Sequence, residues 1–448
     1  MAVSISAPPS IWTCVTPCAT WPVPGPSPWS ACRNQSAVAL YTHRRRKYFR
    51  RRCSFVPVTV DYDYLLAGGG AAGLSLAYHI SQEPRLRHKR VLLLEPAAKD
   101  QNDRTWSFWT DEPTLFDAIV AAEWRQLAFR SPQLDVVRPL QRHRYCTVRG
   151  IDFYRFVRAE LAKRPEQFTW VPTTVDSLEN GAMGVVACTP QGEFTARYAF
   201  DSRPPQLLHD PKYRYLWQHF VGWEVETDYD AFDPDTPVFM DFRVPQGHEC
   251  RFVYVLPFSK RRALVEYTLF SGAQLPRHEY EDALRLYLQA FLAGRTYRII
   301  ETEAGAIPMT DQPFADRSGT NIVHLGTRGG RVKASTGYAF RRMQQHAARL
   351  TAALAATGRL PADLTGDQWQ FRLFDTLLLD IMQRQGETTR DIFAELFAHN
   401  PVERILDFLD ERTSWADNLR IMNSVKPWPF LRSIGHVLRG RPGKRRIS

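Results

Sequence analysis

The pattern of apolar and polar residues is most informative between residues 61 and 95. A short apolar run at residues 64–67 predicts a strand, the spacing of apolar residues over 74–80 predicts a helix, and residues 91–94 predict a second strand. A strand, a helix and a second strand within about thirty residues form a βαβ unit. The chain therefore contains an α/β domain that starts close to residue 61.

Three glycines and one acid give this βαβ unit a specific chemistry. Gly68, Gly70 and Gly73 stand at the GxGxxG spacing directly after the first strand. The first glycine permits a tight turn, the second lets backbone N–H groups approach a pyrophosphate, and the third allows the helix to pack closely. Glu95 ends the second strand, where a carboxylate can accept hydrogen bonds from ribose hydroxyls. The unit predicts dinucleotide binding, and both FAD and NAD fit it.

Strand patterns dominate the middle of the chain. Alternating apolar and polar residues over 145–300 predict a largely antiparallel sheet inserted into the nucleotide-binding fold, and a helical pattern at 278–294 closes it. Residues 302–345 return to glycine-rich turns, the last of which opens a helix over 339–354. Amphipathic helical segments then follow between residues 367 and 440.

These patterns divide the 448 residues into four parts. We predict a disordered basic extension at 1–57, a discontinuous nucleotide-binding domain at 58–144 and 301–350, a substrate-binding sheet domain at 145–300, and a helical region with a basic tail at 351–448. The predicted fold class is α/β, with a Rossmann-type domain, an inserted, mainly antiparallel sheet and a C-terminal helical region.

The net charge of +11 is concentrated at the two ends of the chain. Residues 1–60 contain eight Lys or Arg and no acidic residue, and so do residues 418–448, which leaves residues 61–417 mildly acidic. We recognise no nucleic-acid-binding module beside the basic ends, so we expect no nucleic-acid partner. The apolar runs are shorter than the 18 residues that a transmembrane helix needs. Four of the seven cysteines fall in the first 60 residues, and the other three, Cys146, Cys188 and Cys250, show no metal-ligand or paired spacing. We therefore predict reduced thiols and no metal site.

The first 57 residues are rich in Pro, Ser, Ala and Thr and contain the basic run 44–52. Such a segment buries too little apolar area to offset its ordering entropy, so we predict disorder. Our first interpretation is a dispensable tail or an artefact of an upstream start assignment. An organellar transit peptide, with plastid targeting, and an arm that binds anionic surfaces are the alternatives.

The segment NDRTWSFW, residues 102–109, directly follows the second predicted strand. Its position predicts a loop over the cofactor, in which Asp103 and Arg104 organise the loop or contact the cofactor phosphates. The alternative is an aromatic loop that packs internally and contacts no ligand.

With these blocks in order, the chain resembles the lycopene cyclase family, and specifically its bacterial β-cyclase branch. The matching strings span about residues 61–430 and are GGGAAG, NDRTWSFW, FDSR, FVGWEVET, FMDFRV, LPFSKRRALVEYT, GAIPM and KASTGYAF. The resemblance implies an enzyme that converts the ψ-ends of lycopene into β-ionone rings, giving γ-carotene and β-carotene. Two features depart from the family: Tyr267 follows Glu266 where a second acid is usual, and the N-terminal extension matches nothing in the bacterial branch.

Cyclisation of a ψ-end begins with an acid and involves no net redox change. A proton adds to the terminal double bond, the cation attacks the neighbouring alkene, and a ring proton leaves. Glu266 is the predicted catalytic acid, because it lies in the apolar pattern ALVEYTLF, where burial would raise the pKa of its carboxyl. Alternatively, Glu266 faces outward or pairs with Arg261 or Arg262. Asp241 is the next candidate acid, with pairing to Arg243 as its alternative.

The resemblance implies FAD as the cofactor, active in its reduced form, and NAD(P)H as the reductant that is consumed only to reduce it initially. The predicted cofactor-binding residues are Gly68, Gly70, Gly73, Glu95, Arg104, Gly326, Thr336 and Gly337. Trp106 and Trp223 fall inside matching blocks and are predicted to line the substrate channel, with ordinary core packing as the alternative.

A carotene substrate dissolves in the bilayer, so we expect a cytoplasmic protein that associates peripherally with a membrane surface. The segment 426–446 combines basic residues with apolar ones, a make-up typical of membrane contact. The apolar residues of this segment are Trp428, Phe430, Leu431, Ile434, Val437 and Leu438. A helix packed on the body, followed by a loose basic tail, is the alternative. Other carotenoid enzymes are further expected partners.

Two other functions share part of this pattern. A flavin-dependent monooxygenase, or a reductase acting on a carotenoid or prenyl lipid, has the same Rossmann start and inserted sheet. Aromatic hydroxylases of that group carry a Gly-Asp pair in the second flavin motif, whereas Thr327 stands at the acidic position here. A carotenoid carrier without activity is the other alternative, and the intact glycines with Glu95 and Glu266 argue against it.

Overall fold

The structure is a computed structural model that describes residues 60–364 and 369–440. These residues belong to one compact unit, Pro57–Ser448. The predicted extension at 1–57, with its alternative roles, and the last basic residues at 441–448 lie outside the described part of the chain.

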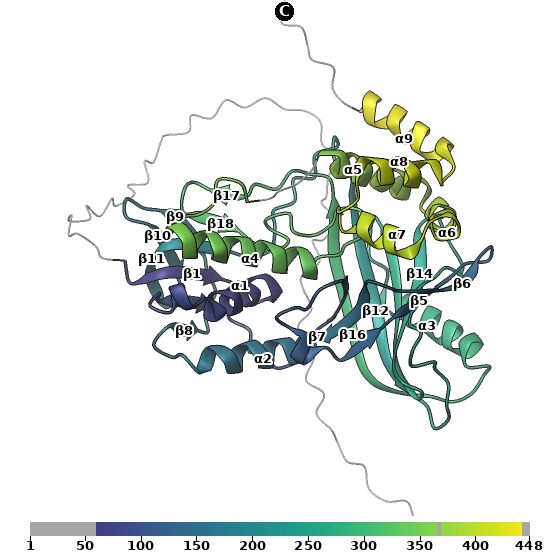
Figure 1. Ribbon diagram of the computed structural model, residues 1–448, viewed down its shortest axis with the longest axis horizontal. Coiled ribbons are helices and arrows are strands. Elements are labelled where there is room, and N and C mark those ends of the chain that lie inside the picture. The colour runs from purple at the N-terminus through teal and green to yellow at the C-terminus, as the bar shows by residue number, and fades with distance from the viewer. Residues whose placement is uncertain (1–59, 365–368, 441–448) are drawn as a thin grey trace, which may run out of the picture. The chain divides into compact units, whose positions relative to one another are not determined.

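Five parallel strands form the centre of the first sheet, in the order β18–β11–β1–β2–β8 (Figure 1). The strands of this sheet are β1 (Tyr62–Ala67), β2 (Val91–Leu94), β8 (Phe168–Val171), β9 (Ser177–Asn180), β10 (Val185–Thr189), β11 (Gly192–Asp201), β17 (Arg317–Ser318) and β18 (Ile322–His324). Tyr64 and Leu66 face a core shared with helices, whereas Leu65 and Ala67 pack towards β9 and β10. Both faces are covered, so β1 reads as a continuous apolar run rather than as an alternating one.

Three helices cover one face of this sheet: α1 (Ala71–Gln82), α2 (Gly150–Ala162) and α4 (Phe340–Thr357). The helix α1 packs against both α2 and α4. Short 3₁₀ turns, Pro84–Leu86 and Asp117–Ile119, complete this part. The arrangement is a Rossmann-type fold, in which the carboxyl ends of parallel strands open onto a ligand site.

A second, seven-stranded sheet has the order β16–β12–β15–β14–β13–β5–β6, antiparallel except for the pair β13 and β5. Its strands are β5 (Gln126–Arg130), β6 (Asp135–Pro139), β12 (Tyr215–Glu226), β13 (Val238–Asp241), β14 (Cys250–Ser259), β15 (Arg262–Ser271) and β16 (Arg298–Thr310). The helix α3 (Arg277–Phe291) packs against one face. The opposite face meets the helical region and the site described below.

The C-terminal helices are α5 (Trp369–Gln385), α6 (Thr388–His399), α7 (Val402–Leu409), α8 (Trp415–Asn423) and α9 (Pro427–Arg439). Phe397 of α6 stacks on Phe129 of β5, with ring centroids 4.4 Å apart, which joins this region to the second sheet. A small third sheet consists of β3 (Thr105–Thr110), β4 (Ala122–Trp124) and β7 (Arg144–Arg149), and the chain forms β5 and β6 of the second sheet between β4 and β7.

The predicted fold class is confirmed, but several local predictions are wrong. Residues 168–201, assigned to the inserted sheet, form β8 to β11 of the first sheet, in which β11 pairs with β1 and β8 with β2. Residues 126–139 belong to the second sheet instead of the nucleotide-binding domain. Residues 302–310, interpreted as a glycine-rich turn, form most of β16, and the predicted loop at 102–109 contains the strand β3. These assignments failed because the chain crosses repeatedly between the sheets. A local sequence pattern indicates that a strand forms but does not indicate which strand it pairs with.

Candidate active site

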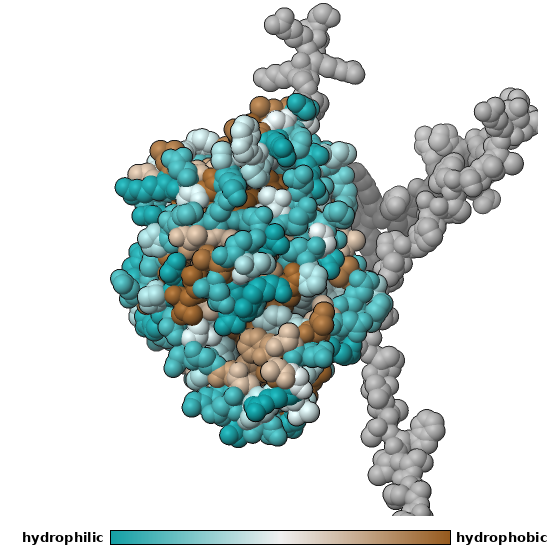
Figure 2. Space-filling model, turned by 90° about the vertical axis from the view of Figure 1, so that its right-hand side faces the viewer, coloured by the Kyte–Doolittle hydropathy of each residue, from teal (hydrophilic) through white to brown (hydrophobic). Residues whose placement is uncertain are grey.

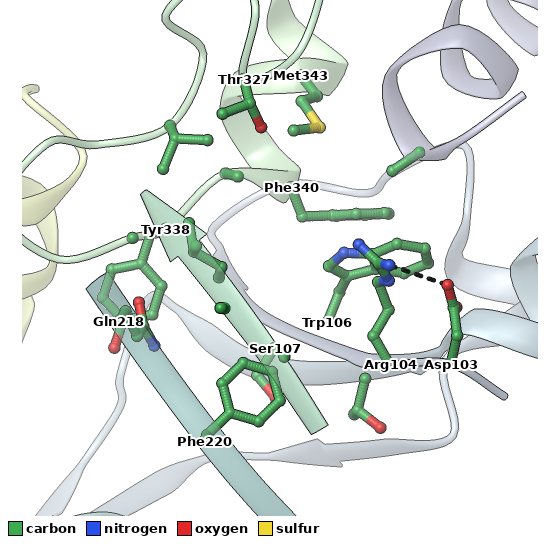
Figure 3. A pocket seen from close by; sticks show the side chains of 18 of the residues that line it. Asp103, Arg104, Trp106, Ser107, Gln218, Phe220, Thr327, Tyr338, Phe340 and Met343 are labelled. Carbon is green, nitrogen blue, oxygen red and sulfur yellow. Dashed lines mark hydrogen bonds and ion pairs between the residues drawn. The ribbon is translucent and has the colours of Figure 1, made fainter. Parts of the chain in front are cut away.

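A cavity of about 330 Å³ lies between the carboxyl ends of the parallel strands and one face of the second sheet. The start of α1 and the glycine turn before α4 form one wall, and residues of β12, β15 and β16 form the other. Arg104, directly before β3, and Thr105 to Ser107 of β3 line the third side (Figure 3). The cavity thus stands where a Rossmann-type fold binds its ligand.

The first glycine turn is shaped for a close approach to the backbone. Gly68 has φ +105°, and a Cβ at Gly73 would stand 2.0 Å from the carbonyl oxygen of Gly68, so neither position accepts a side chain. Gly70 lines the cavity, and a Cβ there would meet no atom within 4 Å. The helix α1 begins at this turn without a side-chain cap, so its first N–H groups are available to an anion.

Two charged residues predicted to bind the cofactor lie close to this turn. Glu95 is buried at the end of β2, and its carboxylate accepts hydrogen bonds from the backbone of Gly69 at 2.6 Å and Ala97 at 2.9 Å. It supports the turn from behind and does not line the cavity. Arg104 does line the cavity, and its guanidinium pairs with Asp103 at 2.9 Å.

The second glycine turn lies beside the first, on the same wall of the cavity, since a Cβ at Gly326 would stand 2.9 Å from Cβ of Ala72. Gly326 and Gly337 both have positive φ and line the cavity, and a Cβ at Gly337 would stand 1.7 Å from the side-chain oxygen of Gln218. That buried oxygen has no hydrogen-bond partner within the described chain, so it is free to meet a ligand. Thr336 was predicted to bind cofactor, but it is buried beneath the turn, outside the cavity lining.

Aromatic rings close part of the cavity. Trp106 of β3 stacks on Phe340 at the start of α4, with centroids 5.5 Å apart, and Figure 3 shows the two rings lying one over the other. The hydroxyls of Tyr338 and Tyr254 lie 3.3 Å apart on the same lining. Trp106 thus lines the cavity, and its role in a substrate channel stays a prediction.

The prediction of Trp223 as a channel residue is wrong. Its neighbour Gly222 faces the two acids on the cavity side of the second sheet, and successive residues of a strand point to opposite faces. Trp223 therefore packs into the core against α3, with the guanidinium of Arg285 5.6 Å from its ring centroid.

Two carboxyl groups lie beside each other on the cavity side of the second sheet. Glu266 of β15 and Glu303 of β16 are both register partners of Gly222, on the strand between them. The hydroxyl of Thr268 donates to Glu266 at 2.7 Å, and that of Thr105 donates to Glu303 at 2.7 Å. Glu266 lines the cavity, as predicted for the acid, whereas Glu303 is 6% exposed and stands behind it.

The surroundings keep the first of these carboxyl groups protonated. Burial raises the pKa of Glu266 well above its usual value, and the negative charge of Glu303 raises it further, against the hydrogen bond from Thr268. Burial raises the pKa of Glu303 to about 7, and the hydrogen bond from Thr105 opposes that rise. A neutral carboxylic acid that faces a largely apolar cavity can act as a proton donor at neutral pH.

The alternative acid, Asp241, lies away from the cavity. It is fully buried, pairs with Arg243 at 2.8 Å and accepts a hydrogen bond from Tyr287 at 2.9 Å. Sequence reasoning missed Glu303, because its segment was interpreted as a turn. The signal was the alternation of Glu301, Glu303, Gly305 and Ile307, which places these four residues on one face of a strand.

Solved structures of flavoenzymes share this fold. A geranylgeranyl bacteriochlorophyll reductase-like protein from Thermoplasma acidophilum matches with a TM-score of 0.54 and 12% identity, over 84% of this chain and 99% of that one. A probable FAD-dependent monooxygenase from Pseudomonas aeruginosa matches with a TM-score of 0.52 and 14% identity, over 74% and 99%. At such low identity these structures establish the fold alone.

Sequence relatives identify the family. The lycopene β-cyclase of Pantoea ananas is 25% identical over 396 residues, covering 84% of this chain and 98% of that protein. The lycopene β-cyclase of a Paracoccus species is 28% identical over 391 residues, covering 83% and 96%. The family model described as lycopene cyclase protein matches residues 63–434. The chain therefore belongs to the lycopene cyclase family.

Proposed function

We propose that this protein is an FAD-containing lycopene β-cyclase, which closes the ψ-ends of lycopene into β-ionone rings without net redox change. The observation that carries this proposal is the position of Glu266. A carboxyl group held in its acid form faces the same cavity as the two glycine turns and Trp106. The relatives named lycopene β-cyclase match nearly their whole length, which supports the same activity here.

In the proposed mechanism Glu266 donates its proton to the terminal double bond of the ψ-end. The resulting cation attacks the neighbouring alkene, and loss of a ring proton completes the β-ring. The faces of Trp106 and Phe340 stabilise positive charge through their π-electrons. Burial raises the pKa of Tyr254 and Tyr338 well above the usual value, so both phenols stay neutral beside the cation.

The residues around the cavity fit FAD. The open position at Gly70 and the uncapped start of α1 would receive the pyrophosphate, Arg104 would contribute positive charge, and the buried oxygen of Gln218 beside Gly337 would meet the ring system. Bound in its reduced, anionic form, FAD supplies negative charge that favours a cation in the cavity. We propose NAD(P)H as the reductant, needed once to reduce the flavin rather than once per ring.

We also propose that α9 contacts a membrane surface. Trp428, Leu431, Ile434 and Leu438 are exposed and recur at helical spacing, so they form one apolar stripe. Figure 2, in which this side of the protein faces the viewer, shows apolar residues near its top. Among the described helices, none is long and apolar enough to span a bilayer.

The predicted set of inserting residues divides into two groups on α9. Val437 is buried and Phe430 packs against a small core with α5 and α6, so these two side chains hold the helix to the body. The hydroxyl of Ser433 donates to the carbonyl of Leu377 on the same side. The helix is therefore attached by one face and presents the other, with Arg432 and Arg439 beside the stripe for anionic headgroups.

We expect Glu266→Gln to abolish cyclisation, because Gln keeps the shape of the side chain but has no proton to donate. Lycopene-accumulating cells that express the protein should form cyclic carotene of unchanged mass. The variant should lower the rate by about 10²-fold or more. Asp241→Asn, which changes the buried acid outside the cavity, is the control and should retain the activity per folded protein. Full activity of a flavin-loaded Glu266→Gln variant would place the acid elsewhere.

We expect Gly70→Ala to lower flavin retention without unfolding the protein. The added methyl group points into open space, so the turn itself tolerates it, but it occupies the path of the pyrophosphate. Gly435→Ala on α9, where a Cβ also meets no atom within 4 Å, is the matched control. Flavin absorbance per protein and circular dichroism measure the two effects. Equal flavin content in both variants would contradict a pyrophosphate site at Gly70.

We expect chemically reduced FAD to support turnover in the absence of any nicotinamide. Anaerobic protein reduced with dithionite should convert lycopene over many turnovers, because the reaction consumes no electrons. With NADPH in place of dithionite, oxidation measured by absorbance should stop after about one equivalent per flavin. Consumption of one NADPH for each ring formed would exclude a redox-neutral reaction.

We expect the double substitution Trp428→Ser with Leu431→Ser to weaken binding to vesicles. Loss of two inserting side chains should lower the partition coefficient at least about tenfold on vesicles of phosphatidylglycerol and phosphatidylcholine. Leu286→Ser is the control, since Leu286 is a comparably exposed leucine on α3. Co-sedimentation measures the bound fraction. Equal binding of the double variant and the wild type would exclude the stripe as the contact.

A further inference from the structure

A glycine separates the two carboxyl groups of the site. In the strand order β16–β12–β15, Glu303, Gly222 and Glu266 stand in one row, directly opposite one another. A Cβ at Gly222 would stand 3.1 Å from Cγ of Glu303 and 3.5 Å from Cβ of Glu266. The missing side chain at position 222 therefore lets side chains from two non-adjacent strands meet above the strand between them.

The two carboxyl groups face different spaces. Glu266 lines the cavity with Trp106, whereas Glu303 lines a separate small hollow together with Asn102, Arg149 and Glu301. Glu301, at the far side of this hollow, is partly exposed and binds the guanidinium of Arg149 at 2.7 Å. The pair therefore connects the largely apolar cavity with a polar region that leads towards solvent.

Glu303 differs from its neighbouring acids because no ion pair within the described ranges includes it. Glu224, on the same face of the sheet, pairs with Arg262, and Glu301 pairs with Arg149. Glu303 accepts one hydrogen bond, from Thr105, and its other oxygen is buried without a hydrogen-bond partner in the described chain. Burial of a carboxylate without a cation is costly, so the group must bind or share a proton.

We propose that Glu303 is the second carboxyl group of the acid site, which shares one proton with Glu266 and returns a proton to it after each ring closure. The charge of Glu303 raises the pKa of Glu266, so the two carboxyl groups disfavour ionising together. This inference rests on the proposed cyclase function. It assigns Glu303 the role of a positioning residue, because Glu303 acts on the substrate through Glu266.

The protons balance over one ring closure. Glu266 loses a proton to the terminal alkene carbon, and the O–H bond breaks as the C–H bond forms. The ring carbon then loses one proton, which passes to the medium. Glu303 takes one proton from water in the polar hollow and passes it to the Glu266 carboxylate. The pair again holds a single shared proton, and no electron is gained or lost.

Several other titratable and charged groups face this pair. Arg104, directly before β3, lowers the pKa of Glu303, and Glu301 on β16 raises it. The phenols of Tyr145 on β7, Tyr254 on β14 and Tyr338 before α4 face Glu266, and burial raises the pKa of all three well above the usual value. These phenols stay neutral over the working range, so the charge closest to Glu266 is that of Glu303.

The test is the pH dependence of cyclisation in the full chain with bound flavin. Activity requires protonated Glu266, so it is lost as pH rises through the pKa of that group. Glu303→Gln removes the neighbouring negative charge and should move this alkaline limb to lower pH by about one unit or more. It should also lower kcat at least about tenfold with an unchanged KM, since proton return is slowed while the cavity keeps its shape.

Glu224→Gln is the matched control, because it also changes a buried acid on the same face of the same sheet. Its alkaline limb should coincide with that of the wild type. If Glu303→Gln does not fold, Glu303→Asp replaces it. The shorter side chain keeps the charge but moves it one methylene group away from Glu266. That variant should shift the limb in the same direction by a smaller amount. An unshifted limb in the folded Glu303 variant, equal to that of Glu224→Gln, would overturn the inference.

An infrared titration separates this inference from the proposed activity. The infrared band of the protonated Glu266 carboxyl group is identified as the carbonyl band that is missing from the spectrum of Glu266→Gln. This band should disappear at a lower pH in Glu303→Gln than in the wild type. This measurement needs no turnover. If the wild-type protein forms no cyclic carotene, the proposed cyclase function is wrong. If the titration of the Glu266 band is unchanged in Glu303→Gln, only the proposed role of Glu303 is wrong.

Discussion

Burial of two carboxyl groups that form no ion pair with any described residue is the constraint on which the site depends. Glu266 and Glu303 stand in register across Gly222, on the side of the second sheet that faces the cavity. Low dielectric surroundings disfavour two adjacent negative charges, and so they hold a proton at the place where a carotene end group would be protonated. The hydroxyls of Thr268 and Thr105 orient the two groups, and Thr105 belongs to β3, which also carries Trp106 over the cavity.

The helical region contributes to the same site through the second glycine turn. Lys333 is buried, and its ammonium group pairs with Asp375 of α5 at 2.8 Å and with Glu411, just after α7, at 3.0 Å. The carbonyl of Lys333 accepts the backbone N–H of Gly337 at 2.9 Å. These buried ion pairs attach the second glycine turn to the helical region. They also hold Gly337 close to the side chain of Gln218. The helices therefore help to build the cavity.

The sequence was sufficient for the elements whose signal is local. The strand and helix periods and the glycine spacing located β1, α1 and β2, and the apolar pattern around Glu266 pointed to a carboxyl group that lines the cavity. The sequence did not predict which distant strands pair with one another. Register decides that Gly222 faces the cavity side and Trp223 the opposite core, and it also brings Glu303 to Glu266. Because the side-chain period of a strand is two, an error of one position reverses every assignment.

Gly222 carries no functional group, yet the chemistry of the pair depends on it. An alanine would place its methyl carbon 3.1 Å from Cγ of Glu303, closer than ordinary van der Waals contact, and 3.5 Å from Cβ of Glu266, so the side chain of Glu303 would have to move. Such a position requires a residue without a side chain. Motif comparisons that consider only reactive residues therefore overlook this glycine. In other chains of this fold, a small residue flanked in register by two acids would mark a proton-sharing site even where the sequence around each acid has diverged.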